Sequence, residues 1–340
     1  MESGLITPSA LIRAGATKGS CHPSTFTSTP KGINMLNALH PLLAKLPTTS
    51  SVLDVVVPRV TRELQDEFVY WVDGGTGVGT SATGYAAILE RELHPEHAGL
   101  ALVICYEPLP ENVLVLKQRL GHDSRYLIRD VAVASQTGTA TFTVPSRITA
   151  AGAGPWAQGT SFAGSLRHGS PSSESISVQT VRLDEESVPR FDFVKLDLQG
   201  AEIDAIQGMG ARLQEVKLFY VETQLLHDWG VLRLLNEQGF VLLFDRLQFG
   251  FRPDLPYVPL ELLGACGIAI DRIHLPQESG MPLICWGHFD AGAEMLDPRS
   301  FVLKSEISKK LIDGGVTYLQ TDALAINVRW LSRIAPCLLP

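Results

Sequence analysis

The sequence is poor in cysteine and has no apolar stretch long enough to cross a membrane. Its 340 residues include 5 cysteines, which are widely scattered and form no Cys-x-x-Cys pair (Cys21, Cys105, Cys266, Cys285 and Cys337). Neither a disulfide framework nor a zinc site is indicated, so we predict a reducing compartment, the cytoplasm. Because no apolar run reaches the roughly 18 residues that a spanning helix needs, we also predict a soluble chain without a membrane span.

Basic residues are in deficit as well. The chain has 28 lysines and arginines against 36 aspartates and glutamates, which gives a net charge of -8 at pH 7. This balance argues against the broad positive surface of nucleic-acid-binding proteins, so we predict a small-molecule partner and no nucleic acid. Hydrophobic residues make up 45% of the chain, which is enough for the core of one large α/β domain with extensions.

The most informative segment leads from Phe68 into a glycine-rich turn. Mostly apolar residues, typical of a buried parallel strand, precede Asp73, and residues 81–91 have the pattern of a helix. Between them lie four glycines (Gly74, Gly75, Gly77 and Gly79). Glycines permit positive φ angles and a close approach to the backbone, and a helix start offers unpaired N–H groups. The segment therefore predicts a strand–loop–helix cradle for a phosphate or a nucleotide.

Asp73 narrows the choice of ligand. A carboxylate at this turn would repel the pyrophosphate of a dinucleotide, whereas it would attract the cationic methionine head of S-adenosylmethionine. The pattern Gly77-x-Gly79-x-x-Ala82 also matches a dinucleotide fingerprint, but the acid that normally follows about 20 residues later is missing. A turn that only reverses the chain is a third interpretation. We favour a methyl donor, with Asp73, Gly75, Gly77 and Gly79 as its ligands.

Acidic residues also follow later strands. Glu107 ends the predicted strand 100–106, where a carboxylate can accept hydrogen bonds from two ribose hydroxyls; a solvated acid at a strand end is the alternative. Asp130 lies between the predicted strands 126–129 and 131–134 and is a candidate for the adenine amino group, although a plain turn acid would look the same. Both are predicted cofactor ligands.

A second acid–glycine turn follows the predicted strand 190–196. Asp197 stands at the end of the strand, Gly200 lets the backbone turn, and Glu202 begins a predicted helix over 202–209. We expect this turn to face the first one. Glu202 is either a substrate contact or a structural cap, and Asp197 is a candidate catalytic residue.

Two further candidate bases follow the predicted strand 216–221. Glu222 continues the pattern of an acid at the end of each strand. His227 lies near the start of a predicted helix, 226–238, where the helix N-terminus disfavours the protonated imidazole and leaves a neutral base. An ordinary surface histidine is the alternative. Acids near one cleft could instead hold a divalent ion, but our prediction includes no metal.

Residues 145–175 are rich in glycine, serine and proline and show no sustained period. A structureless insert of this length inside a compact domain is commonly a binding loop or a lid, so we predict that it contacts the substrate. Thr160 and Ser161 are the candidate contacts, with Trp156 and His168 as further candidates.

Other strands are predicted from β-rich runs. The turn residues 135–138 separate two such runs and indicate a hairpin, and residues 177–183 alternate as an edge strand does. A sixth strand is predicted at 240–247 and a seventh at 266–270.

Both ends of the chain look like additions to a central domain over 51–290. Residues 1–50 indicate a flexible leader with a short helix. Residues 291–340 indicate a helical extension, with one helix starting at Asp297 and another over 322–334, each with an apolar stripe. These stripes would pack on the domain or form a homodimer through the terminal helices.

With these residues in place, the chain resembles the FkbM family of S-adenosylmethionine-dependent methyltransferases from about Phe68 to Phe244. The resemblance rests on Val72-Asp-Gly-Gly-Thr-Gly-Val-Gly79, Tyr106-Glu-Pro108, Val131-Ala-Val-Ala-Ser135 with Gly138 and Phe142, Arg182-Leu-Asp184, Val194-Lys-Leu-Asp-Leu-Gln-Gly-Ala-Glu202 and Tyr220-Val-Glu222. The last two segments, in that order behind a glycine loop, are fairly specific. The family usually has Ala-Asn where this chain has Thr76-Gly77, so any contact of that Asn side chain is lost.

The resemblance implies a class I methyltransferase fold. This is a Rossmann-like α/β domain with a seven-stranded, mainly parallel sheet, an antiparallel last strand and helices on both faces. It also implies S-adenosylmethionine as cofactor and O-methylation of a hydroxyl on a sugar or natural product. By the same resemblance, Asp73 with the glycine turn would hold the methionine end, Glu107 the ribose, and Asp197 and Glu202 would line the active face.

Methyl transfer from a sulfonium is a direct displacement, so the protein must align the acceptor oxygen and remove its proton. Two alternatives remain open. A nicotinamide-dependent oxidoreductase would be protected against heat by NAD, whereas a methyltransferase would be protected by S-adenosylhomocysteine. A catalytically silent methyltransferase-like domain would bind a partner through its terminal helices and would never turn over a donor.

Overall fold

The computed structural model describes residues 57–58, 60–61, 69–92, 101–145, 161–162, 173–227, 230–252, 254–255, 257–274, 284–289, 295–297, 301–331 and 333. The chain forms two compact units, which are centred on Thr61–Leu218 and Phe219–Pro340. The predicted leader 1–50 and most of the insert 145–175 lie outside the described residues.

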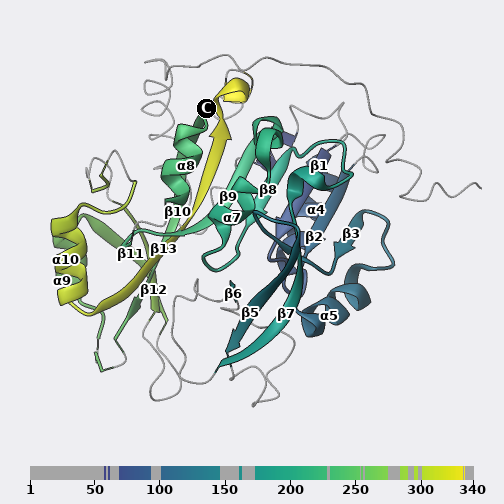
Figure 1. Cartoon of the computed structure of the whole chain (residues 1–340). Coiled ribbons are helices and arrows are strands. Elements are labelled where there is room, and N and C mark those ends of the chain that lie inside the picture. The colour runs from purple at the N-terminus through teal and green to yellow at the C-terminus, as the bar shows by residue number, and fades with distance from the viewer. Residues whose placement is uncertain are drawn as a thin grey trace, which may run out of the picture. The chain divides into compact units, whose positions relative to one another are not determined.

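Four parallel strands form the main sheet of the first unit (Figure 1). In spatial order they are β8 (Phe193–Leu196), β1 (Val69–Gly74), β2 (Ala101–Tyr106) and β3 (Tyr126–Arg129). The helix α4 (Thr80–Glu92) follows β1, and α5 (Pro110–Leu120) follows β2. Parallel neighbours need such crossover helices, so this alternation confirms the α/β class predicted from the sequence.

Trp71 of β1 packs against helix α4 and against the neighbouring strand β8. Trp71 is fully buried, and its ring stacks on Tyr85 of α4 with the ring centroids 4.1 Å apart. On the sheet itself, the Trp71 ring lies 5.0 Å from the ring of Phe193 in β8. Strands that are covered on both faces are typical of parallel sheets. This packing anchors the carboxyl end of β1 and the glycine turn that follows it.

A smaller sheet in the first unit corrects two predictions. Its order is β4-β7-β5-β6, with the strands β4 (Ala132–Val133), β5 (Gly138–Pro145), β6 (Ser161–Phe162) and β7 (Ser173–Val181). Because β7 lies between β4 and β5, residues 135–138 do not close a hairpin and β7 is not an edge strand. The reason is long-range pairing, since β7 pairs with the whole of β5 and Thr180 donates a hydrogen bond to the Gln136 carbonyl at 2.8 Å.

Three short helical segments complete the first unit: η2 (Leu183–Glu185), α7 (Glu202–Gln207) and η3 (Gly210–Glu215). Of these, α7 starts at the residue predicted for it and directly follows the loop at the tip of β8. Arg212 of η3 places its guanidinium 3.9 Å from the centroid of the Phe191 ring and donates to the Val188 carbonyl, which ties η3 to the segment before β8.

The second unit holds five strands in the order β11-β12-β10-β13-β9 (Figure 1). Their bounds are β9 (Leu218–Gln224), β10 (Phe240–Phe251), β11 (Ile268–His274), β12 (Ile284–Phe289) and β13 (Val316–Asn327). The helices are α8 (Val231–Glu237), α9 (Leu260–Ala265) and α10 (Ser305–Asp313). The pairs β10–β12, β10–β13 and β11–β12 are antiparallel.

The predicted helix over 322–334 is wrong in its first half, because residues 322–327 belong to strand β13, whereas residues 328–331 are helical. Leu324, Ala325 and Ile326 are fully buried, so this apolar run is covered on both faces as in an inner strand. Val328, which was expected on the apolar stripe, is 42% exposed. Of the predicted C-terminal helices, α10 is present and ends before Gly314 as predicted, although it starts at Ser305. The terminal segment therefore contributes a core strand to the second unit in addition to helix α10.

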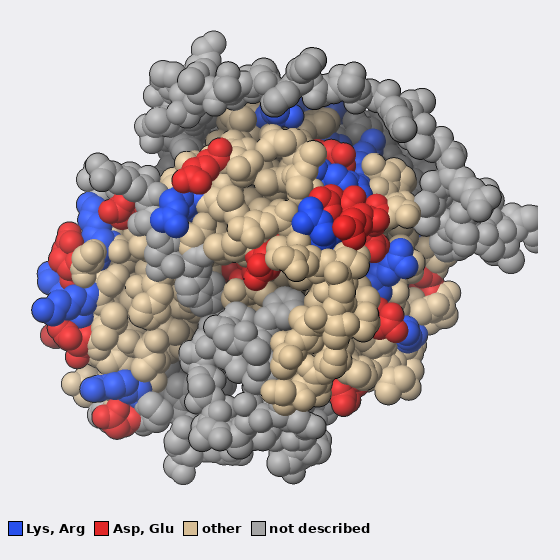
Figure 2. Space-filling model, viewed as in Figure 1, with Lys and Arg blue, Asp and Glu red and all other residues tan. Residues whose placement is uncertain are grey.

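Four strands in the main sheet of the first unit and five in the second make nine, two more than the seven predicted. The strand predicted at 266–270 is present as β11, and the predicted antiparallel last strand is present as β13, which runs antiparallel to β10 as β12 does. None of the described helices is both long and apolar enough to span a membrane. On the face drawn in Figure 2, acidic and basic side chains of the described residues lie interspersed.

Candidate functional site

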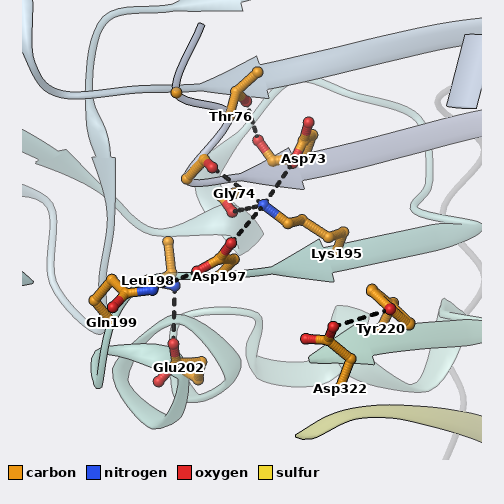
Figure 3. A network of polar contacts seen from close by, with 12 residues as sticks. Asp73, Gly74, Thr76, Lys195, Asp197, Leu198, Gln199, Glu202, Tyr220 and Asp322 are labelled. Atoms are coloured by element: carbon orange, nitrogen blue, oxygen red, sulfur yellow. Dashed lines mark hydrogen bonds and ion pairs between the residues drawn. The ribbon is translucent and has the colours of Figure 1, made fainter. Parts of the chain in front are cut away.

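The two acid–glycine turns of the first unit meet where β1 and β8 end (Figure 3). The Asp197 N–H donates to the Gly74 carbonyl at 3.1 Å. A Cβ added to Gly75 would lie 2.0 Å from the Asp197 carbonyl oxygen, so only glycine permits this approach. Because β1 and β8 are parallel neighbours, their carboxyl ends share one edge of the sheet. The expectation that the second turn faces the first is confirmed.

Lys195 joins the two turns and was missed by the sequence reasoning. Its ammonium nitrogen lies 3.3 Å from Asp73 Oδ1 and 3.5 Å from Asp197 Oδ2 (Figure 3). It also donates to the carbonyls of Gly74 and Gly75, at 3.5 and 3.1 Å. The signal was a lysine in the middle of the apolar strand Phe193–Leu196, where a buried charge needs partners. Lys195 is thus a hub between β1 and β8.

The charges of this hub depend on burial. The Lys195 side chain is only 6% exposed and that of Asp73 is 0% exposed, whereas Asp197 is 41% exposed. Burial alone would lower the pKa of Lys195, but Asp73 and Asp197 outweigh it and raise that pKa, so the ammonium stays protonated. Burial raises the pKa of Asp73, and Lys195 opposes this rise. Apart from its contact with Lys195, the Asp73 carboxylate accepts no hydrogen bond in the described part of the chain.

Backbone hydrogen bonds hold the glycine turn in shape. The N–H groups of Gly75 and Thr76 both donate to the Tyr106 carbonyl of β2, at 3.1 and 3.2 Å. The Thr76 hydroxyl donates to the Asp73 carbonyl at 2.6 Å. Gly75, Gly77 and Gly79 have φ angles of 72°, 57° and 87°, which is the left-handed conformation expected of glycines at this turn. A Cβ at Gly77 would meet nothing within 4 Å, so the turn is open on that side.

Glu107 borders the open side of the turn. It is 4% exposed, its Oε2 accepts the Gly77 N–H at 2.7 Å, and its Oε1 accepts the Leu109 N–H at 2.9 Å. Burial raises the pKa of Glu107, while these N–H groups and the Asn112 side chain act in the opposite direction. A carboxylate has about four acceptor sites, and the Gly77, Leu109 and Asn112 donors leave one of them for a ligand hydroxyl.

Asp130 follows β3, the next strand beyond β2. Its side chain is 67% exposed and pairs with Lys117 of α5 at 3.2 Å. A hydrogen bond from its own backbone N–H and one from Lys117 lower the pKa of Asp130, so the carboxylate is ionised at neutral pH. The adenine contact predicted for Asp130 stays a prediction.

Glu202 supports the loop at the tip of β8. It is 0% exposed, and its Oε1 accepts the Leu198 N–H at 2.8 Å (Figure 3). The Gly200 N–H binds both of its carboxylate oxygens, at 3.2 and 3.0 Å. These bonds stabilise a loop in which Gln199 and Gly200 have positive φ angles of 55° and 107°. These contacts favour the structural alternative for Glu202, and its substrate contact stays a prediction.

The other two candidate bases belong to the second unit. Glu222 is 4% exposed within β9. His227 is exposed, and α8 begins only at Val231, after Gly230 in the left-handed conformation. The expected effect of a helix N-terminus on His227 is therefore wrong, because α8 begins at Val231, five residues later than predicted. Thr160 lies outside the described residues, and Ser161 is described only as backbone in β6. No metal-binding group of three His, Cys, Asp or Glu is found among the residues that the structure describes.

A protein family model described as the methyltransferase FkbM domain matches residues 75–252, which is more than half of the chain. The match contains most of the glycine turn as well as Glu107, Lys195 and Asp197, and it starts just after Asp73. No curated protein matches the chain.

Several solved methyltransferase structures are similar to this chain at low sequence identity. Methyltransferase FkbM from Methylobacillus flagellatus KT is 13% identical, with a TM-score of 0.34, and the match covers 76% of this chain but only 60% of that protein. A precorrin-6y C5,15-methyltransferase from Geobacter metallireducens GS-15 is 12% identical, covers 72% of this chain and 91% of its own, and has a TM-score of 0.32. An O-methyltransferase from Bacillus cereus in complex with SAH is 12% identical, covers 77% and 91%, and has a TM-score of 0.26.

Proposed function

Because this chain belongs to the FkbM methyltransferase family, we propose that it transfers a methyl group from S-adenosylmethionine to a hydroxyl oxygen of a small-molecule acceptor. The methyltransferase class follows from the family. The donor, the oxygen target and the small acceptor, a sugar or a natural product, are the parts that we propose. They are supported by the residues around the glycine turn and by the tip of β8.

The observation that carries the proposal is the open side of the glycine turn beside the Glu107 carboxylate. A Cβ at Gly77 would touch nothing within 4 Å, and the Gly77 N–H binds Glu107 Oε2 at 2.7 Å. A ligand on this side can approach the backbone closely and can donate a ribose hydroxyl to Glu107. This combination suits a nucleoside with a free ribose hydroxyl.

The charge at the tip of β8 also suits this donor. Asp73 and Asp197 contribute two negative charges and Lys195 one positive charge, so the three leave one net negative charge. S-adenosylmethionine has a sulfonium, an ammonium and a carboxylate, which leave one net positive charge. Opposite charges attract, whereas the pyrophosphate of a dinucleotide would be repelled. Lys195 reduces the negative charge that the sequence reasoning assigned to Asp73 alone, but it does not reverse its sign.

The residues present therefore fit this cofactor. The buried Asp73 carboxylate and the glycine turn would hold its methionine end, Glu107 its ribose, and Asp130 remains our proposed contact for the adenine amino group. When bound, S-adenosylmethionine supplies an activated methyl group on a positively charged sulfur.

The residues of the chain then have two tasks, to orient the acceptor hydroxyl and to take its proton. Asp197 is the proposed base that we favour, because its partly exposed carboxylate stands at the sheet edge where the two turns meet. Glu222 and His227 remain proposed bases, one buried and one exposed. Alignment of the acceptor supplies much of the acceleration in a direct displacement of this kind.

Isothermal titration calorimetry on the full chain tests the proposal. We expect S-adenosylhomocysteine to bind and NAD to give no binding heat; the reverse result would establish the nicotinamide-dependent alternative. Asp73→Ala should weaken S-adenosylhomocysteine binding by about tenfold or more. An unchanged affinity in this variant would remove Asp73 from the donor site. Failure of the wild type to bind any donor would favour the catalytically silent binding domain.

We further propose a cytoplasmic location, since the described cysteines Cys105, Cys266 and Cys285 are free and buried. In the proposed homodimer through terminal helices, β13 shortens the second predicted helix, and α10 remains as the longer one, where Ile312 is 45% exposed. Light scattering of the purified chain tests this proposal, because a monomeric mass would exclude the dimer.

A further inference from the structure

One face of the sheet in the second unit changes from apolar to polar halfway along its strands. Every second residue of β13 faces the same side. On that side Leu324 and Ile326 are fully buried, whereas Asp322, Gln320 and Tyr318 are polar and partly exposed. A solvated face is polar throughout, and a core face is apolar throughout. The change of polarity therefore indicates a local site at one end of the strands.

The strands on both sides of β13 continue the polar part of this face. On β10, Gln248 pairs with Gln320, and a register shift between Phe244 and Leu247 turns it to this side. On β9, the Tyr220 hydroxyl donates to Asp322 Oδ2 at 3.1 Å (Figure 3), and Glu222 lies two residues further on the same side. We call these residues the polar half-face (Tyr220, Glu222, Gln248, Tyr318, Gln320 and Asp322).

Burial distinguishes the polar half-face from an ordinary solvated surface. Glu222 is only 4% exposed, and a buried position in a strand is normally taken by an apolar residue. Glu222 also lies close enough to Tyr318 for its charge to add to the rise that burial causes in the tyrosine pKa, and buried acids beside such groups are common at functional sites. Beside it, Gln248 donates a hydrogen bond to the Tyr318 hydroxyl at 3.1 Å, which fixes the orientation of both side chains.

The polar half-face lies toward the carboxyl ends of β9 and β10. The strand β13 runs antiparallel to β10. The contacts of β9 with β13 run in opposite directions too, because Tyr220 binds Asp322 and the Leu225 N–H binds the Leu319 carbonyl. The strands β9 and β10 are therefore parallel to each other. Open α/β sheets bind their ligands at the carboxyl ends of parallel strands.

Aromatic rings give this face a flat apolar surface. The Tyr318 ring lies directly over Gly250, where an added Cβ would come within 1.9 Å of it. In β12, the partly exposed Trp286 pairs with Gln248, and the Arg272 guanidinium lies 5.2 Å from its ring. A pyranose ring has apolar faces and hydroxyls around its edge. Aromatic rings beside amide and carboxylate groups match both features.

We propose that the polar half-face binds the methyl acceptor, and that this acceptor is a neutral polyhydroxylated ring. The assignment rests on the proposed methyltransferase function and adds to it the acceptor class and its residues. Glu222 and Asp322 accept hydrogen bonds from hydroxyls, and Gln248 and Gln320 both donate and accept them. The two carboxylates give the polar half-face a negative charge that disfavours an anionic ring. Tyr318 contacts the apolar side of the ring.

The probe is a panel of neutral methyl hexopyranosides, with the corresponding methyl hexopyranosiduronates as anionic counterparts. Saturation-transfer NMR on the full chain with excess S-adenosylhomocysteine measures their binding. We expect at least one neutral hexoside to bind with a dissociation constant on the order of 1 mM, and its uronate to bind about tenfold more weakly. Gln320→Leu and Tyr318→Phe should each weaken the hexoside by about three- to tenfold, since each removes hydrogen-bonding groups.

Gln207→Leu on the exposed side of α7 is the matched control and should leave hexoside binding unchanged. The conservative Tyr318→Phe variant keeps the ring over Gly250, so the test stands even if Gln320→Leu fails to fold. Absence of any hexoside signal, equal binding of hexoside and uronate, or indifference to both variants would overturn the acceptor assignment. Calorimetry with S-adenosylhomocysteine separates the two proposals: if that ligand binds and no hexoside does, only the acceptor assignment fails. If hexosides bind and no donor does, the donor assignment fails and the polar half-face stands as a sugar site.

Discussion

Lys195 places its ammonium nitrogen 3.3 Å from a carboxylate oxygen of Asp73, and the two side chains are 6% and 0% exposed. The pair joins neighbouring strands, because Asp73 stands in β1 and Lys195 in β8. Buried ion pairs bring little net stability relative to apolar residues, since both charges lose their water. Removing one partner has a different effect, because the remaining charge is left buried without compensation.

Lys195→Met should therefore destabilise the protein by about 3–5 kcal/mol, since it leaves Asp73 as a lone buried carboxylate. The double variant Asp73→Asn/Lys195→Met should recover much of this loss because neither charge remains. Urea unfolding measures both. Lys117→Met provides the control, because it breaks the exposed pair with Asp130 and should cost about 1 kcal/mol or less. Equal losses in the two single variants would contradict the buried-charge explanation.

Two glycines of the turn should be needed for different reasons: Gly75 because a side chain would clash with the protein, and Gly77 because a side chain would occupy the space proposed for the ligand. Gly75→Ala forces a Cβ to within 2.0 Å of the Asp197 carbonyl oxygen at a φ of 72°, so we expect a loss of roughly 3 kcal/mol or more. Gly77→Ala meets no atom within 4 Å and should cost only the conformational strain, about 1–2 kcal/mol. The same variant should weaken S-adenosylhomocysteine by about tenfold, because its methyl group enters the proposed donor space.

Gly84→Ala is the control for the glycine series. It lies in α4 with open space around its added Cβ and without a positive φ. We expect it to stabilise the helix by about 0.5–1 kcal/mol and to leave the donor affinity unchanged. Calorimetry and thermal unfolding on the same samples provide both measurements. If Gly77→Ala binds S-adenosylhomocysteine as Gly84→Ala does, the donor does not lie on the open side of the turn.

The glycine turn was predictable because its signals are local. A run of apolar residues, an acid and four glycines within six positions determine a strand, a turn and positive φ angles without help from distant residues. The role of Lys195 was not predictable in this way, because its partner Asp73 is 122 residues away. Only pairing between β1 and β8 brings the two together.

Long-range strand pairing also explains why β13 was predicted as a helix. The apolar positions Leu324, Val328 and Leu331 recur at helical spacing, so the local pattern indicated a helix. Antiparallel pairing with β10, about 80 residues earlier in the chain, overrides that preference. The polar half-face depends on this strand, so it too was outside the reach of sequence reasoning, apart from Glu222.

Glu107 should make donor binding depend on pH. Burial raises its pKa above the usual 4.5, so the carboxylate that would accept the ribose hydroxyl is ionised only above that raised value. Affinity for S-adenosylhomocysteine should therefore be full at neutral pH and should fall as the pH drops through a point above 4.5. The stability linked to Glu107 has the opposite sign: it is fully present below pH 4.5 and is lost as the pH rises through the raised pKa.

Calorimetry between pH 4 and pH 8, roughly the range in which a raised carboxyl pKa titrates, measures the affinity, and urea unfolding over the same range measures the stability. The side chain of Glu107→Gln cannot titrate. In this variant, neither the affinity for S-adenosylhomocysteine nor the free energy of unfolding should show the pH dependence expected from Glu107. A wild-type affinity that does not change with pH would exclude Glu107 from the ribose contact.

Asp197 and Glu202 should have separable effects, although they lie five residues apart in one loop. Glu202→Ala removes the carboxylate that accepts from the Leu198 and Gly200 N–H groups in a loop with positive φ angles, and we expect a loss of roughly 3 kcal/mol. Asp197→Asn, at a 41% exposed position, should leave unfolding nearly unchanged but should slow methyl transfer by about 100-fold or more. Urea unfolding and S-adenosylhomocysteine release with an acceptor used by the wild type distinguish the two. A stable but inactive Glu202→Ala would favour a substrate contact of Glu202 over structural support.

A substitution at Gly250 tests whether the Tyr318 ring contacts the proposed acceptor. Its position on β10 faces Tyr318 on β13, and an added Cβ would come within 1.9 Å of the tyrosine ring. Gly250→Ala must therefore displace that ring and break the hydrogen bond from Gln248 to the Tyr318 hydroxyl, with an expected loss of about 1–3 kcal/mol. Hexoside binding should fall with it. In the double variant Gly250→Ala/Tyr318→Ala the clash disappears, so stability should partly return while hexoside binding stays low. Recovery of hexoside binding in that double variant would mean that the Tyr318 ring is not part of the acceptor site.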